Sequence, residues 1–282
     1  MQGIVKNLPS FTTRHILVVY FKEHVKYVGE KASVTQRALA RMMPNIGGPG
    51  PFKRRIIAAV VTSIMLYACP IWSEALSVGT TRRILSSVYR LSAIRRVSGF
   101  RTVSDEAVLV LAKAIPIDIL ADEMRRIYFH RLEYPGQLAA IKAEERRTSM
   151  RKWQSRWESS LKGRWTFRLI PDVTLWMKNN HCELNYYVTQ FLTGHGCFRK
   201  YLHRFGHDTS STCSNCVDEE EDAEHILTCC HRFGWPGGTN LGPNRLMEEL
   251  LNNRVLWSQY SQKMAEFMIE LRRLEERRRN FN

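Results

Sequence analysis

Most of the chain carries the hydrophobic pattern of amphipathic helices. Within 80–97, apolar residues recur at every third or fourth position: Ile84, Val88, Leu91 and Ile94. This period is typical of a helix with one buried face. Comparable patterns predict helices over 22–43, 105–114, 117–132 and 137–161, and one long charged helix over 244–279. Signals for strands are few, so we expect a mainly α fold.

Local signals refine this picture at three places. Ser104 precedes two acidic residues and is a typical N-cap for the helix at 105–114. The segment 45–51 (NIGGPGP) predicts a loop, because glycine and proline interrupt regular structure. The segment 184–192 fits a helix or a strand, because its β-branched and aromatic residues also favour strands.

A long apolar run covers 52–76. Its uncharged part, 56–72, is only just long enough for a membrane-spanning helix, which needs about 17–25 residues. It also contains Thr62, Ser63 and Pro70. We therefore expect a buried core helix here, with a single-pass membrane protein as the alternative.

The 282 residues include 42 Lys and Arg against 27 Asp and Glu, a net charge of +15. Such an excess favours a polyanionic partner, either nucleic acid or an anionic membrane surface. The charge is uneven, because residues 213–231 carry six acidic side chains and no Lys or Arg. Seven cysteines, an odd number, and no secretory leader at Met1–Asn7 favour reduced thiols or a metal site over a disulfide framework.

The strongest motif is a cluster of cysteines and one histidine inside this acidic segment. Cys213 and Cys216 have the C-x-x-C spacing, His225 follows, and Cys229 or Cys230 supplies a fourth donor. Three thiolates and one imidazole form a closed tetrahedral zinc set, which leaves no position for a reacting water. The sequence therefore predicts a structural zinc, with His225 on a short helix.

Two basic segments are candidate nucleic-acid contacts. Arginines at 83, 90, 95 and 96 decorate the helix at 80–97, and Arg83 and Arg90 share a face because they lie two turns apart. A phosphate-binding row and an ordinary solvated face are equally consistent with this pattern. A second segment interleaves tryptophans with cations, and we expect Trp153 and Trp157 in the core and Lys152, Arg156 and Arg164 on nucleic acid.

Several catalytic signatures are absent from the sequence. It contains no Walker-type glycine loop, no G-x-S-x-G elbow and no Asp-Asp pair of the kind that holds two metal ions in polymerases. The histidines and Cys197 within 195–207 fit no standard metal spacing, so packing and hydrogen bonding are favoured there.

Four stretches together resemble one protein family. They are RMMPNIGGP at 41–49, YACPIW at 67–72, VSGFRTVSDEA at 97–107 and QFLTGHGCFR at 190–199, followed by the Cys/His cluster. This order resembles the carboxy-terminal third of the polyprotein of non-LTR retrotransposons, in the clade that inserts into ribosomal RNA genes. In that family an endonuclease and a reverse transcriptase precede such a region.

The resemblance implies a division along the chain. Residues 1–21 are unmatched, 22–134 are a helical thumb-like region, and 135–212 are a basic, aromatic-rich linker region. Residues 213–233 are a zinc knuckle, and 234–282 are a turn and the charged helix. The family's spacing implies Cys213, Cys216, His225 and Cys230 as ligands.

The resemblance also implies a function. We expect the C-terminal fragment of an RNA-directed DNA polymerase polyprotein, which binds RNA and DNA in the nucleus and the rest of the polyprotein. The catalytic carboxylates and their Mg²⁺ would lie outside this chain, so we expect no reaction from it alone and no membrane contact. The alternatives are a zinc-stabilised protein–protein adaptor and the membrane protein described above.

Overall fold

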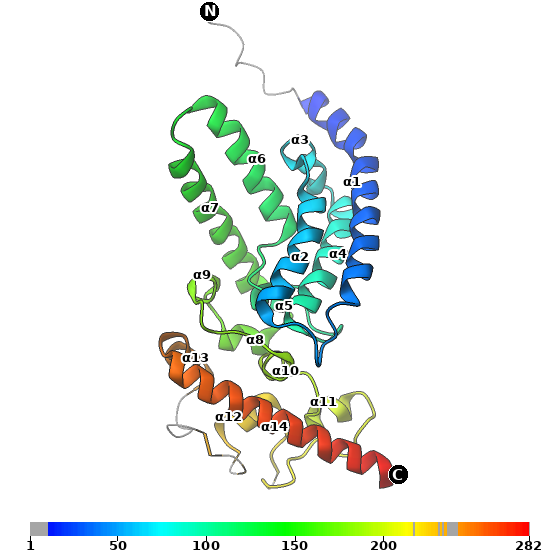
Figure 1. The fold of residues 1–282 in the computed structure, drawn as a ribbon, viewed down its shortest axis with the longest axis vertical. Coiled ribbons are helices and arrows are strands. Elements are labelled where there is room, and N and C mark those ends of the chain that lie inside the picture. The colour runs from blue at the N-terminus through cyan, green and yellow to red at the C-terminus, as the bar shows by residue number, and fades with distance from the viewer. Residues whose placement is uncertain (1–10, 217, 231, 233, 236–241, 282) are drawn as a thin grey trace, which may run out of the picture. The chain divides into compact units, whose positions relative to one another are not determined.

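The structure is a computed structural model that describes residues 11–216, 218–230, 232, 234–235 and 242–281, with side chains from 21 to 277. Every regular element in these ranges is a helix, which confirms the mainly α fold (Figure 1). The chain forms two compact units, each built from separated segments. The first contains residues up to 42 with 55–93 and 115–153, and the second contains 43–54, 94–114 and 154–282. The consecutive regions expected from the family stay a prediction.

The first unit is a set of packed helices (Figure 1). Gly29 allows close contact inside it, because a Cβ atom at this position would lie 2.5 Å from Cγ2 of Ile84. The elements are α1 (Phe11–Ala40), α2 (Pro51–Leu66), α3 (Cys69–Trp72), the 3₁₀ helix η1 (Ser73–Ser77), α4 (Gly79–Val97), α6 (Ile117–Glu133) and α7 (Leu138–Ser159). One end of α2, α4 and α7 extends into the second unit.

The prediction of one buried helix in the apolar run at 52–76 is wrong. Ala68 adopts the left-handed conformation (φ 52°), which separates α2 from α3. Buried residues such as Val61 and Met65 occupy only one face, whereas Ile56 and Tyr67 are 52% and 78% exposed. Within the described residues, no single helix is long and apolar enough to cross a membrane. Helix α2 and residues 69–77 are together long and apolar enough, but the chain bends by 50° between them.

Helices α6 and α7 run side by side, joined at one end (Figure 1). Ion pairs connect them: Arg126 contacts Glu145, and Nη2 of Arg146 lies 2.8 Å from Oε1 of Glu123. Both glutamates are buried. A buried carboxylate is costly without a cationic partner, so these pairs fix the register of the two helices.

The second unit contains the shorter helices and the carboxy-terminal pair. They are α5 (Asp105–Leu111), α8 (Arg164–Leu169), α9 (Val173–Lys178), α10 (Tyr186–Thr193), α11 (Arg199–Arg204), α12 (Ala223–Thr228), α13 (Pro243–Asn252) and α14 (Arg254–Phe281). Ser104 caps α5 as predicted, accepting a hydrogen bond from the Ala107 amide. The ambiguous segment at 184–192 forms helix α10, which Asn185 caps through the Val188 amide.

The single helix predicted for 244–279 is two helices. The chain leaves helical geometry at Asn253 (φ −130°, ψ 103°), whose side chain caps the next helix by accepting from the Leu256 amide at 3.0 Å. The bend lets α13 and α14 pack on each other and α14 pack on α10. Leu250, Trp257 and Met264 are thereby buried. Part of the turn expected between residue 234 and the predicted helix, residues 236–241, lies outside the described ranges.

Candidate metal centre and basic surfaces

Local hydrogen bonds shape the segment around the Cys/His cluster. The Cys213 amide donates to the Glu219 carbonyl at 2.7 Å, which turns the chain back on itself. Asp222 caps α12 by accepting from the His225 amide at 2.9 Å. At the other end of α12, the Cys230 amide donates to the His225 carbonyl at 2.9 Å. These bonds bring both ends of the segment together, and His225 lies on a short helix as expected.

Four possible ligand atoms converge there. One atom each from Cys213, Cys216, His225 and Cys230 lies within 4.8 Å of the other three. The Sγ atom of Cys230 lies 3.9 Å from that of Cys213 and 3.9 Å from that of Cys216. Cys229 is exposed instead, with its Sγ 3.1 Å from the Thr228 hydroxyl. Of the two candidates for the fourth position, the structure therefore places Cys230 in the cluster.

The chemistry of this cluster suits zinc. Three thiols and one imidazole are a standard structural zinc set. Within the described residues, neither ring nitrogen of the buried His225 has a hydrogen-bond partner, a costly state for a polar group. Burial and the neighbouring thiols raise the pKa of Cys230 to about 12. A bound zinc ion would accept the lone pair of one imidazole nitrogen of His225 and would favour the thiolate forms of the three cysteines.

Basic residues outside the segment neutralise much of its acidity. Nζ of Lys200 lies 2.7 Å from Glu220 and 2.9 Å from Asp222. Arg168 on α8 binds the carboxylate of Glu224 through two of its nitrogens. The sequence could not pair these residues, because up to 56 positions separate them. The acidic segment is therefore not a uniformly negative surface.

A buried tryptophan attaches α12 to the carboxy-terminal helix. The indole nitrogen of Trp235 donates to the Ile226 carbonyl at 2.8 Å. Its ring stacks on Tyr260 of α14, with centroids 5.1 Å apart and planes inclined by 13°. This contact joins the helix that carries His225 to the core of the second unit.

The predicted arginine row lies along one helix, α4. Arg83 is exposed, and Arg90 is half-buried on the same face two turns later. Arg95 and Arg96 are half-buried at its last turn. A guanidinium nitrogen of Arg95 lies 3.5 Å from Oδ1 of Asn45. Arg83 is therefore the most accessible of the four arginines, and their role on nucleic acid stays a prediction.

The three cations predicted to bind nucleic acid in the linker region contact other groups of the protein: they are Lys152, Arg156 and Arg164. Lys152 lies 2.8 Å from Asp122, and Arg156 lies 2.7 Å from Glu106. Arg164 stacks 3.8 Å above the Phe167 ring. Such contacts reduce the positive charge that these residues offer to phosphates, so their predicted role on nucleic acid stays a prediction.

The tryptophans of the same segment behave as predicted. Trp153 and Trp157 are fully buried. The indole nitrogen of Trp157 donates to the Ile170 carbonyl at 2.8 Å. These rings are core residues and are not free to stack on bases.

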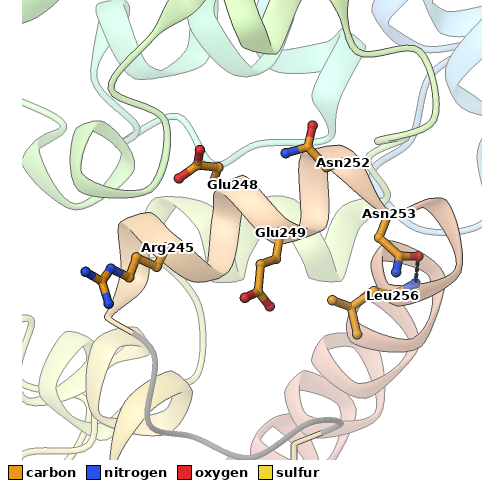
Figure 2. Close-up of a pocket in the computed structure, with 6 residues that line it drawn as sticks. All are labelled: Arg245, Glu248, Glu249, Asn252, Asn253 and Leu256. Carbon is orange, nitrogen blue, oxygen red and sulfur yellow. Dashed lines mark hydrogen bonds between the residues drawn. The ribbon is translucent and has the colours of Figure 1, made fainter.

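A hollow of about 540 Å³ lies at the junction of α13 and α14 (Figure 2). Its lining residues are Arg245, Glu248, Glu249, Asn252, Asn253 and Leu256. Figure 2 shows that Glu248 and Glu249 project from opposite sides of α13. Groups that diverge in this way do not form a catalytic pair.

Curated proteins of mobile elements are similar to this chain. The 115 kDa protein of the type-1 retrotransposable element R1DM of Drosophila melanogaster is 29% identical in an alignment of 294 positions that covers 94% of this chain. The Pol polyprotein of element R1 2 of Nasonia vitripennis is 29% identical in an alignment of 231 positions that covers 76% of this chain. That of element R1 of Bradysia coprophila is 26% identical over 80% of this chain.

The chain spans only part of each of these relatives: 28%, 55% and 24% of their respective lengths. No family profile matches the chain, and no solved structure matches it significantly. The similarity nonetheless extends over most of the chain and includes elements from three insects. The resemblance seen in the sequence is confirmed: over most of its length, this chain is similar to part of the proteins of R1 retrotransposable elements.

Proposed function

We propose that this chain is the C-terminal, post-palm part of an R1-type polyprotein and that it holds template RNA and target DNA during reverse transcription and integration. The observation that carries the proposal is the convergent Cys₃His cluster in a chain homologous to retrotransposon polyproteins over most of its length. The same proposal places it in the nucleus, where a chromosomal target lies.

The zinc ion would act structurally at Cys213, Cys216, His225 and Cys230. Four protein donors saturate tetrahedral zinc, so the ion would hold the two ends of this segment together and activate no water. Folding of the segment would then depend on the metal, because a structural zinc site contributes much of the folding energy of a small module.

Nucleic-acid binding would depend on the net positive charge of the chain, +15. Each phosphate that Lys or Arg neutralises releases counterions, which makes affinity fall with salt. The ion pairs of Lys200 and Arg168 support this function, because they lower the negative charge that phosphates would meet. The polymerase carboxylates and their Mg²⁺ belong to other parts of the polyprotein, so we expect no primer extension by this chain alone.

Fluorescence anisotropy with labelled RNA and DNA at several salt concentrations tests the proposal. The zinc-loaded chain is expected to bind both, with affinity that falls linearly on a log–log plot against salt. Absence of binding at 50 mM salt, or affinity independent of salt, would refute the proposal.

A second candidate, a zinc-stabilised protein adaptor, is favoured by one observation. Four large apolar residues within 56–71 are 43–78% exposed: Ile56, Val60, Tyr67 and Ile71. Exposed apolar patches often mark protein contacts. The adaptor would bind no nucleic acid in the same titration, so one experiment separates the two candidates.

A further inference from the structure

Four rings of the second unit form a continuous aromatic cluster outside the metal centre. The imidazole of His195 lies 5.1 Å from the Tyr201 ring, and Tyr201 lies 4.9 Å from the Phe205 ring, measured between centroids. Phe100 extends the cluster at 6.5 Å from His195. These residues come from three separate segments, 100–102, 195 and 201–205, so the sequence alone could not assemble them.

One end of this cluster is open to solvent. Phe205, at the end of α11, is 48% exposed. Gly206 follows with φ 70°, and a Cβ atom there would meet no atom within 4 Å. Tyr201 behind it is held in place, because its hydroxyl hydrogen-bonds with that of Thr102 at 3.0 Å. The cluster therefore presents a supported aromatic ring to an open space.

The cations at the two ends of helix α11 have different partners. Arg199 and Lys200, at its start, bind Asp208 and the acids of the metal segment. Arg204, at its end, places its guanidinium 5.8 Å from the centre of the Phe205 ring. Arg101 is exposed on the neighbouring segment beside Phe100 and Thr102. Positive charge thus accompanies the open aromatic ring.

His195 contributes to the cluster as a neutral ring. Burial lowers its pKa, and the Arg204 guanidinium lowers it further, although hydrogen bonds to the backbone of Thr193 and Thr102 oppose this. Its Nδ1 lies 2.8 Å from the Thr193 carbonyl, which can accept a hydrogen bond from the neutral ring when this nitrogen carries the proton. A neutral imidazole extends an aromatic platform without adding a second fixed charge.

We propose that Phe205, supported by Tyr201 and flanked by Arg204, stacks on an unpaired base of a single-stranded nucleic acid. An open aromatic ring beside cations is the usual platform for single strands, because every base has a face that can stack while its phosphate meets the cation. Bases in a duplex already stack on their neighbours. The inference rests on the proposed function and assigns one contact within it.

The test measures binding of the full, zinc-loaded chain to labelled oligo(dT), oligo(rU) and a DNA duplex. Phe205→Ala is expected to weaken single-strand binding about 5- to 150-fold, the range for loss of one stacked base. The slope of affinity against salt is expected to stay unchanged, and Phe205→Trp to retain tight binding. Arg204→Gln is expected to lower that slope by about 0.7. Comparison of oligo(dT) with oligo(rU) shows whether DNA or RNA binds at Phe205.

Phe129 on α6 supplies a matched control. It is 46% exposed and also lies beside an arginine, with the Arg125 guanidinium 5.9 Å from its ring centre. Phe129→Ala should leave single-strand affinity unchanged. Equal losses in both alanine variants, or an equal loss on duplex and single strand for Phe205→Ala, would overturn the inference.

Cross-linking of the unmodified protein makes the test independent of how the variants fold. An oligonucleotide containing 5-iodouracil should cross-link to the tryptic peptide 201–204 or to Phe205 itself, which fragment sequencing must distinguish from the metal segment because both lie in the tryptic peptide 205–232. Cross-links confined to other residues would overturn the inference while leaving the proposed function intact. If the unmodified chain binds no oligonucleotide at all, the proposed function itself fails.

Discussion

Arg168 and Glu224 face each other across 56 positions of sequence, with Nη1 2.5 Å from Oε2 and the second nitrogen on the second oxygen. The same guanidinium lies 5.9 Å from the centre of the Trp165 ring. This pair connects α8 to the helix that carries His225. Two parallel hydrogen bonds fix both distance and orientation, so the pair orients the metal segment as well as neutralising it.

Loss of this pair should destabilise the second unit slightly. Both side chains are more than one-third exposed, so Glu224→Gln is expected to cost about 0.2–1 kcal/mol of unfolding free energy. Adding Arg168→Gln should cost little more, because the interaction is already lost. Urea unfolding of both single variants and the double variant measures the coupling. Fully additive costs would show that the two residues act independently.

The metal cluster predicts opposite outcomes for two adjacent cysteines. Cys230→Ala should release the zinc, because it removes one of four donors, whereas the exposed Cys229→Ala should retain it. Metal analysis of the purified variants measures this difference. Retention of one zinc per chain by Cys230→Ala would exclude Cys230 as a ligand.

Trp235 should be among the residues most important for stability. It is 6% exposed, and it joins α12 to α14. Trp235→Ala is expected to cost about 3–5 kcal/mol, the usual range for a buried aromatic. Tyr67→Ala, at a 78% exposed position, should cost less than about 0.5 kcal/mol. Thermal or urea unfolding compares the two, and a cost below 1 kcal/mol for Trp235→Ala would contradict the packing described.

The arginines of α4 should contribute to salt-dependent binding. Arg83→Gln and Arg90→Gln are each expected to lower the slope of log affinity against log salt by about 0.7–0.9, the effect of one lost phosphate contact. Arg147→Gln on α7 is the control, because that guanidinium contacts Glu144. Unchanged slopes in both variants would show that Arg83 and Arg90 contact solvent and not phosphates.

The half-buried His195 predicts a dependence of stability on pH. Its pKa is lowered in the folded chain, so the unfolded chain binds more protons between the folded value and about 6.5. Its contribution to stability is complete above about pH 6.5 and decreases as pH falls below that value. The difference in unfolding free energy between the unmodified chain and His195→Gln should therefore shrink from pH 7.5 to pH 5.5. His203→Gln, at an exposed position of α11, is the control. A difference that does not change with pH would contradict this.

The sequence predicted most helices, because each pattern lies within one segment. It also predicted the Ser104 cap, the buried Trp153 and Trp157, and the helix that carries His225. It did not predict the bend at Asn253, because the hydrophobic period of the flanking helices continues through it. The break at Ala68 was missed for a related reason, since alanine ordinarily favours helix.

The candidate site was predictable only in part. The C-x-x-C spacing identifies a metal motif, but its residues alone left Cys229 and Cys230 open. The choice came from the family resemblance, and the structure agrees through the backbone turn after α12. The aromatic cluster and the partners of Lys200 and Arg168 depend on contacts between distant segments. No local pattern records such contacts.

The interleaved segments of the two units have a consequence for synthesis of the chain. Every segment of the first unit has been made once Trp153 leaves the ribosome, whereas the second unit also needs α14. Segments 43–54 and 94–114 are therefore made before the larger part of their unit, residues 154–282. A ribosome that stalls between α7 and α14 would release a chain with a complete first unit and exposed apolar segments, a natural substrate for chaperones and proteases.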